Sequence, residues 1–157
     1  MGHSAGGLHI RLFSIRYPEE VADLVFVDPA HEHLWIEWKR RFPDIYETWL
    51  RENDERSPGG GLNEWLAFKA ELPDFGMPGP PADVPLVVLT ALKPEAPFYT
   101  AEFDQAFLEI LFDAHELLAR SVTNGTHTAT ERSGHYIHRE EPQLVIDAIR
   151  QVAEAVR

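Results

Sequence analysis

The sequence predicts an α/β fold in which helices cover both faces of a doubly wound, mostly parallel sheet. Near-continuous apolar runs at residues 21–27 and 86–89 are typical of strands that are buried on both faces. Segments with apolar residues at helical spacing alternate with these runs, and strands that alternate with helices favour a parallel sheet. A chain of 157 residues, 44% of them apolar, is the size of one globular domain.

The first helix is expected over residues 5–16, where apolar side chains recur at helical spacing. The pattern ends before Pro18, because proline disfavours a helical conformation in the residue that precedes it. The apolar run at residues 21–27 then predicts the first buried strand, which ends at Asp28.

Two further strands and two further helices follow. The second strand is expected over residues 86–89, after a proline-rich loop, and the third over residues 126–130, after the turn pair Asn124-Gly125. An apolar stripe predicts a helix over residues 101–120 between them. The last helix is expected over residues 142–156 and begins with a proline, which the first turn of a helix tolerates.

Residues 31–82 have a different character and are predicted to form an inserted helical lid. Breaks at Pro43 and at residues 57–61, which are rich in glycine, split the segment into helical pieces. It contains all four tryptophans of the chain, which are Trp35, Trp38, Trp49 and Trp65. We therefore expect one domain over residues 1–157 with an insertion, and not two domains.

Composition and charge exclude several classes of partner and chemistry. The formal net charge of −12 repels nucleic acid and anionic lipid, and the longest apolar stretch is far shorter than the roughly 20 residues that span a bilayer. The absence of cysteine excludes a thiol nucleophile and cysteine-ligated metal. His31-Glu32 and His115-Glu116 both resemble the start of an H-E-x-x-H zinc motif, but Trp35 and Ala119 replace its second histidine. We expect no metal and no organic cofactor.

Residues 2–6 read Gly-His-Ser-Ala-Gly, which is a G-x-S-x-G sequence at the start of a helix. In a nucleophile elbow the flanking glycines allow a sharp, strained turn, where neighbouring Cβ atoms would collide. Such a turn exposes the Ser4 hydroxyl and points the N–H of Ala5 at a developing oxyanion, and His3 would line it. The alternative is a glycine-rich helix start in which Ser4 only caps the helix.

A serine nucleophile needs an imidazole base, and a carboxylate best holds that base. His135 lies in a loop after the third predicted strand, and the carboxyl ends of strands are where open α/β sheets bind ligands. Asp28 follows the first predicted strand at the equivalent edge. The chain order Ser4, Asp28, His135 is that of α/β-hydrolase triads.

With these motifs the chain resembles the C-terminal part of an α/β-hydrolase fold enzyme of the lipase, esterase and haloperoxidase-like kind. The resemblance rests on the elbow, on residues 24–29 (Leu-Val-Phe-Val-Asp-Pro) and on residues 133–138 (Ser-Gly-His-Tyr-Ile-His). It implies Ser4 as nucleophile, His135 as base and the N–H of Ala5 as one oxyanion donor. A serine at this position argues against the dehalogenase and epoxide hydrolase branches, which use a carboxylate nucleophile.

The resemblance leaves the acid open and predicts a missing segment. Many members carry the acid after the strand that here ends near Leu89, where only Glu95 is close, whereas others carry it where Asp28 stands. We expect Asp28 to be the acid, with Glu95 as the alternative. The family elbow also follows a buried strand, but only Met1 precedes Gly2. We therefore expect a truncated chain with an incomplete sheet, whose second oxyanion donor and any targeting signal would lie in the absent part.

The predicted function is hydrolysis of a small carboxylic ester or related acyl substrate through an acyl-enzyme. The competing hypothesis is a non-catalytic remnant or interaction module that keeps the triad residues by descent. The sequence identifies neither the substrate nor the oligomeric state.

Overall fold

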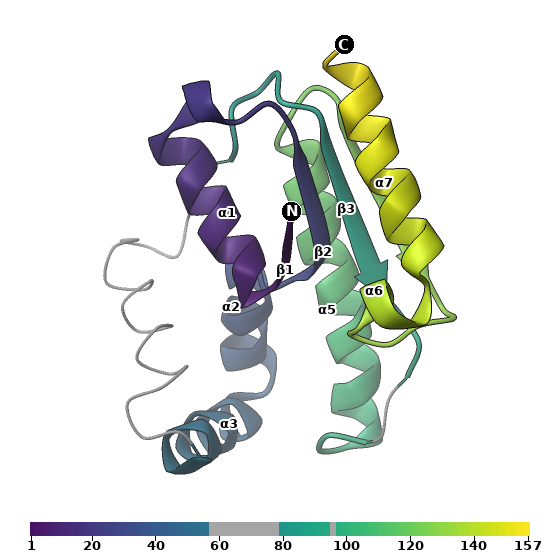
Figure 1. Ribbon diagram of the computed structural model, residues 1–157. Coiled ribbons are helices and arrows are strands. Elements are labelled where there is room, and N and C mark those ends of the chain that lie inside the picture. The colour runs from purple at the N-terminus through teal and green to yellow at the C-terminus, as the bar shows by residue number, and fades with distance from the viewer. Residues whose placement is uncertain (57–78, 95–96) are drawn as a thin grey trace. The chain divides into compact units, whose positions relative to one another are not determined.

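The computed structural model describes residues 1–56, 79–94 and 97–157 (Figure 1). Contacts divide the chain into two compact units, one formed by residues 1–31 with 78–157 and the other by residues 32–77. All of the strands in the described residues belong to the first unit, which also contains every candidate site residue that can be located.

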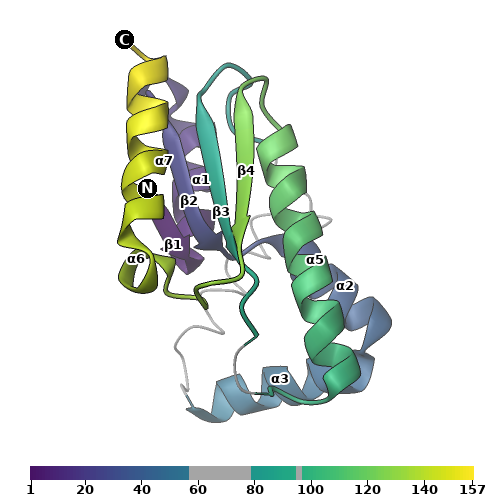
Figure 2. The same cartoon turned by 90° about the vertical axis from the view of Figure 1, so that its right-hand side faces the viewer.

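Within the described residues, four parallel strands form one sheet in the order β1-β2-β3-β4. They are β1 (Gly2–Ser4), β2 (Leu24–Pro29), β3 (Leu86–Ala91) and β4 (Gly125–Thr130). Because every pair is parallel, the carboxyl ends of all four strands meet at one edge of the sheet, as Figure 2 shows for β2, β3 and β4. The predicted parallel sheet is confirmed.

Helices cover both faces of this sheet. They are α1 (Ala5–Arg16), α5 (Ala101–Arg120), α6 (Ile137–Glu140) and α7 (Pro142–Ala155), with a short 3₁₀ helix, η1 (Pro18–Glu20). Figures 1 and 2 show α7 on one face and α1 and α5 on the other. The predicted α/β class is therefore confirmed.

Two apolar cores explain why β2 and β3 read as continuous apolar runs. Val25, Val27, Val87 and Leu89 pack with residues of α6 and α7 on one face. Phe26 and Val88 are fully buried on the other face, where they pack with Leu118 of α5 and with neighbouring residues. Alternate side chains thus enter opposite cores, and both must be apolar.

The structure corrects two expected boundaries. The first expected strand, 21–27, begins only at Leu24, because η1 intervenes and the N–H of Val21 donates to the Pro18 carbonyl. The second expected strand, 86–89, extends to Ala91 as β3. Gly2–Ser4 form the short strand β1, which pairs with β2, and the expected missing segment before it stays a prediction. The helices expected over residues 5–16 and 101–120 have the bounds that the sequence predicts.

In the second unit, two helices are described, α2 (Glu32–Arg41) and α3 (Pro43–Arg56), and the break falls at Pro43 as predicted. The Trp49 ring lies 5.9 Å from the Trp38 ring and 6.5 Å from the Trp35 ring, measured between centroids. Trp65 and residues 57–61 lie outside the described residues. The role of residues 31–82 as a lid stays a prediction.

Candidate active site

Ser4 lies at the turn between β1 and α1, in a backbone conformation that a serine rarely adopts. Its φ is 53° and its ψ is −128°. Such conformations cost about 1–3 kcal/mol and persist only where the surroundings hold them. The Ser4 side chain makes no capping hydrogen bond to α1, so the alternative interpretation as an ordinary helix cap gains no support.

The glycines around Ser4 allow this turn by close backbone approach. A Cβ atom on Gly2 would lie 2.4 Å from the carbonyl oxygen of Gly6, and one on Gly7 would lie 2.4 Å from the Cβ of Pro29. A Cβ on Gly6 would meet no described atom within 4 Å. The expected need for a residue without a Cβ therefore holds at Gly2 but not at Gly6. The second position with this need is Gly7, where α1 passes close to Pro29 at the end of β2.

The turn holds Ser4 beside the end of β2. Ser4 aligns with Pro29 in the parallel pairing, and the N–H of Ala30 donates a hydrogen bond of 2.9 Å to the Ser4 carbonyl. Ala5 is the first residue of α1, where backbone N–H groups have no acceptor within the helix. The helix start beside Ser4 therefore provides a donor suited to an oxyanion.

Asp28 is the last residue but one of β2 and also has a positive φ, of 45°. Within the described residues, Ser4 and Asp28 are the two non-glycine residues with this property. The Asp28 side chain is 5% exposed and both of its oxygens accept hydrogen bonds, Oδ1 from the N–H of Ala91 at 2.9 Å and Oδ2 from Nδ1 of His135 at 2.6 Å. The carboxylate is thus fixed between the end of β3 and the imidazole.

His135 lies in the loop between β4 and α6, and its side chain is 38% exposed. Contacts at both ends of the loop hold it. Thr130, the last residue of β4, donates a hydrogen bond of 2.5 Å to Glu141, which immediately precedes α7 and whose pKa this bond lowers. Lys93 forms an ion pair of 2.9 Å with Glu140. These two contacts hold the loop that carries His135 against the carboxyl ends of β3 and β4.

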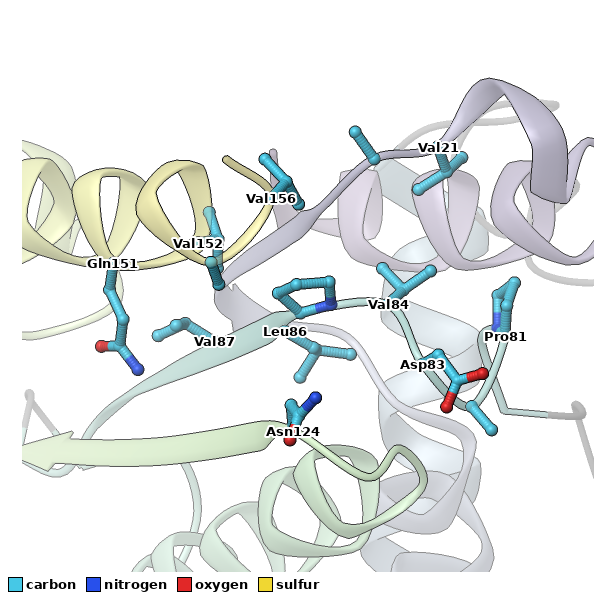
Figure 3. A pocket seen from close by; sticks show the side chains of 14 residues that line it. Val21, Pro81, Asp83, Val84, Leu86, Val87, Asn124, Gln151, Val152 and Val156 are labelled. Carbon is cyan, nitrogen blue, oxygen red and sulfur yellow. The ribbon is translucent and has the colours of Figure 1, made fainter.

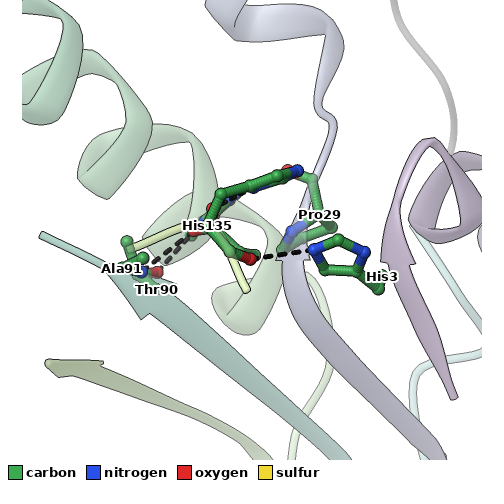
Figure 4. A network of polar contacts seen from close by, with 7 residues as sticks. His3, Pro29, Thr90, Ala91 and His135 are labelled. Carbon is green, nitrogen blue, oxygen red and sulfur yellow. Dashed lines mark hydrogen bonds and ion pairs between the residues drawn. The ribbon is translucent and has the colours of Figure 1, made fainter. Parts of the chain in front are cut away.

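His3, in β1, contacts the same loop. Its Nε2 donates a hydrogen bond of 2.8 Å to the carbonyl of His135, and the two rings lie 4.5 Å apart (Figure 4). The His138 ring lies 4.7 Å from the His3 ring, edge to face. Burial lowers the pKa of His3, which favours a neutral ring that donates to the carbonyl.

The structure thus brings Asp28 and His135 into a direct hydrogen bond, beside the turn that carries Ser4. Glu95, the alternative acid, lies outside the described residues. Sequence analysis did not predict two hydrogen bonds, the one from the Ala91 N–H to Asp28 and the one from His3 to the His135 carbonyl. Neither has a local signature, because each joins segments that are far apart in the chain.

Other features of the described residues do not enlarge the site. No group of three metal-ligating side chains occurs in that part of the chain, and no helix there has the length and apolarity to cross a membrane. A cavity of about 450 Å³ lies where β3 begins and is lined by residues that include Val84, Asn124 and Val152 (Figure 3). It opens at the amino ends of the strands, whereas Ser4 and Asp28 lie at the carboxyl ends.

Comparison with known proteins finds one family similarity, over the first part of the chain. Residues 1–75, which include Ser4 and Asp28, match the alpha/beta hydrolase fold family. No curated protein and no solved structure matches the chain. The match covers the G-x-S-x-G sequence and β2, and the parallel sheet with helices on both faces agrees with it. The match and the architecture together support an α/β-hydrolase fold for this chain.

Proposed function

We propose that this protein is a serine hydrolase of small carboxylic esters or related acyl substrates, with Ser4 as nucleophile, His135 as base and Asp28 as acid. The observation that carries the proposal is the 2.6 Å hydrogen bond between His135 Nδ1 and Asp28 Oδ2, beside the strained turn of Ser4. A carboxylate on Nδ1 holds an imidazole in the tautomer whose Nε2 can accept a proton.

The backbone of both residues supports a catalytic role. Strained backbone conformations cost stability and persist only where the surrounding structure holds them, and they are concentrated at active sites. Here the strain falls on the proposed nucleophile and the proposed acid, which are neighbours across β1 and β2. If Ser4 had only a structural role, its hydroxyl would be expected to form the capping hydrogen bond that serine readily forms at a helix start, and it forms none.

The chemistry follows in two steps. His135 accepts the proton of Ser4 as the hydroxyl attacks the substrate carbonyl, and the N–H of Ala5 donates to the resulting oxyanion. The imidazolium then protonates the leaving alcohol, and the acyl group stays on Ser4. Water then gives a proton to His135 as it attacks the acyl-enzyme, and the imidazolium returns this proton to Ser4 Oγ as the carboxylic acid leaves. Asp28 keeps its negative charge throughout and stabilises the imidazolium.

Turnover of p-nitrophenyl acetate tests the proposal. We expect a burst of nitrophenol as the acyl-enzyme forms, and loss of both burst and turnover in Ser4→Ala and His135→Ala. Ser121→Ala is the matched control, because Ser121 lies at the end of α5 and its hydroxyl donates to a local acceptor, the Leu118 carbonyl.

Unchanged turnover in Ser4→Ala would overturn the assignment of the nucleophile. If the folded wild-type protein neither turns over esters nor reacts at Ser4, the alternative of a non-catalytic descendant of such a hydrolase replaces the proposal.

A further inference from the structure

A chain of hydrogen bonds beneath the site joins α5 to the end of β2. His127 Nδ1 lies 2.8 Å from Glu116 Oε2, and His127 Nε2 lies 2.6 Å from Thr90 Oγ1. Thr90 Oγ1 lies 2.6 Å from His115 Nδ1, and His115 Nε2 lies 2.7 Å from the carbonyl oxygen of Pro29. Thr90 and His115 are fully buried, and the side chain of His127 is 5% exposed.

The two end groups of this chain of hydrogen bonds, the Glu116 carboxylate and the Pro29 carbonyl, determine how many protons the groups between them must supply. A carboxylate and a backbone carbonyl can only accept hydrogen bonds. Four hydrogen bonds therefore need four protons from the three side chains between them, whereas neutral His127, Thr90 and His115 supply only three. One of the two imidazoles must carry an additional proton.

The surroundings assign that proton to His127. Burial lowers the pKa of His115 to about 4, so this ring is neutral and donates from Nε2 to Pro29. His127 faces the carboxylate of Glu116, whose pKa is lowered, first by the hydrogen bond to His127 and also by Arg120. The ring of Phe112 lies 4.7 Å from that of His127, tilted by 45°, within the distance at which aromatic rings attract a cation.

We propose that Glu116, His127 as an imidazolium, Thr90 and neutral His115 form a proton-ordered chain that positions Asp28 by holding the Pro29 carbonyl. The functional part of this inference rests on the proposed role of Asp28 as the acid. His127 then donates to both Glu116 and Thr90, Thr90 donates to His115, and His115 donates to Pro29, so every bond has one proton. His115, Thr90, His127 and Glu116 are positioning residues, because none of them would touch substrate.

The site needs such support at this point. Asp28 has a positive φ, and a strained residue keeps its conformation only where the next residues are held. The Ala91 N–H fixes the Asp28 carboxylate, and the chain fixes the carbonyl of Pro29, the residue that follows Asp28. Together they set the direction in which Oδ2 meets His135.

Nitrogen-15 NMR of the imidazole rings at neutral pH tests the proton count in the intact protein. We expect His127 to show two protonated nitrogens and His115 to show the neutral tautomer with hydrogen on Nε2. In Glu116→Gln the amide can itself donate to His127 Nδ1, so the fourth proton is no longer needed and we expect His127 to become neutral. A neutral His127 in the wild-type protein, or hydrogen on Nδ1 of a neutral His115, would overturn the assignment.

The positioning role is tested by the downfield proton resonance of the hydrogen bond between His135 and Asp28. Thr90→Val interrupts the chain, and we expect this resonance to shift or broaden, whereas Thr90→Ser restores it. Thr128→Val is the matched control, because Thr128 is an exposed residue of β4 outside the chain. An unchanged resonance in folded Thr90→Val, or a failure of Thr90→Ser to restore it, would overturn the role.

The same spectra of Ser4→Ala separate this inference from the proposed function. That variant cannot form an acyl-enzyme, yet the imidazole nitrogens of its His115 and His127 should give the same NMR signals as in the wild-type protein. If the wild-type protein shows the predicted tautomers but no hydrolysis, the serine hydrolase proposal is refuted and the proton-ordered chain is retained. If it hydrolyses esters but His127 is neutral, the proton-ordered chain is refuted and the serine hydrolase proposal is retained.

Discussion

Replacement of Asp28 by asparagine separates the catalytic role of the carboxylate from its structural role. The N–H of Ala91 donates to Oδ1, so the amide oxygen of the introduced asparagine must take that position. The amide nitrogen then faces His135 Nδ1, where Oδ2 of the carboxylate accepted a proton at 2.6 Å. The imidazole must therefore accept at Nδ1 and carry its hydrogen on Nε2, and in this tautomer it cannot take a proton from Ser4.

The expected effects on activity and on stability differ widely. The wrong tautomer lowers kcat by about 10⁴-fold, which corresponds to about 5 kcal/mol in the activation barrier. Stability should change by only about 1 kcal/mol, because both hydrogen bonds are remade and asparagine tolerates the positive φ at least as well as aspartate.

Ester turnover and urea unfolding of the same samples measure the two effects. Asp83→Asn is the matched control, since Asp83 is exposed near the opposite edge of the sheet. Glu95→Gln tests the alternative acid and should change turnover little. If Asp28→Asn keeps turnover within about tenfold of the wild-type protein while Glu95→Gln abolishes it, the assignment of the acid is wrong.

Three further predictions concern stability and are read from unfolding curves. Burial keeps His115 neutral down to about pH 4, whereas the unfolded chain takes up this proton near pH 6.5. The free energy of unfolding should therefore fall, on the order of 3 kcal/mol, as the pH drops between these values, and His115→Gln should flatten this dependence. Gly7→Ala should cost about 1–3 kcal/mol because its Cβ would meet Pro29, whereas Gly6→Ala should be neutral or stabilise by up to about 1 kcal/mol. Ser4→Gly should be about 1 kcal/mol more stable than Ser4→Ala, because glycine relieves the positive φ. Equal stabilities within either pair, or no pH dependence, would contradict the corresponding argument.

Local patterns predicted the elements of the fold well, because their determinants are local. The helix over residues 101–120 has an unbroken apolar stripe and an N-cap threonine, Thr100, and its observed bounds agree with the prediction. The pairing of Asp28 with His135 was also expected, since residues that follow parallel strands meet at one edge.

Contacts between distant segments could not be predicted in the same way. Nothing in the Asp-Pro sequence specifies the positive φ that Asp28 has in the structure. The bond between Thr90 and His127 spans 37 positions, and that between His115 and Pro29 spans 86. Each of these histidines taken alone resembles an ordinary polar residue, so only the fold reveals their connection.

Reaction with a fluorophosphonate, followed by mass spectrometry of tryptic peptides, tests the central claim most directly. An activated serine reacts with such a probe whatever its natural substrate. The tryptic peptide of residues 1–11 contains Ser4 as its sole hydroxyl-bearing residue, so an adduct on this peptide identifies the nucleophile. We predict one adduct per chain on this peptide, lost in His135→Ala. An unmodified peptide from folded protein, or an adduct that persists in His135→Ala, would contradict the account.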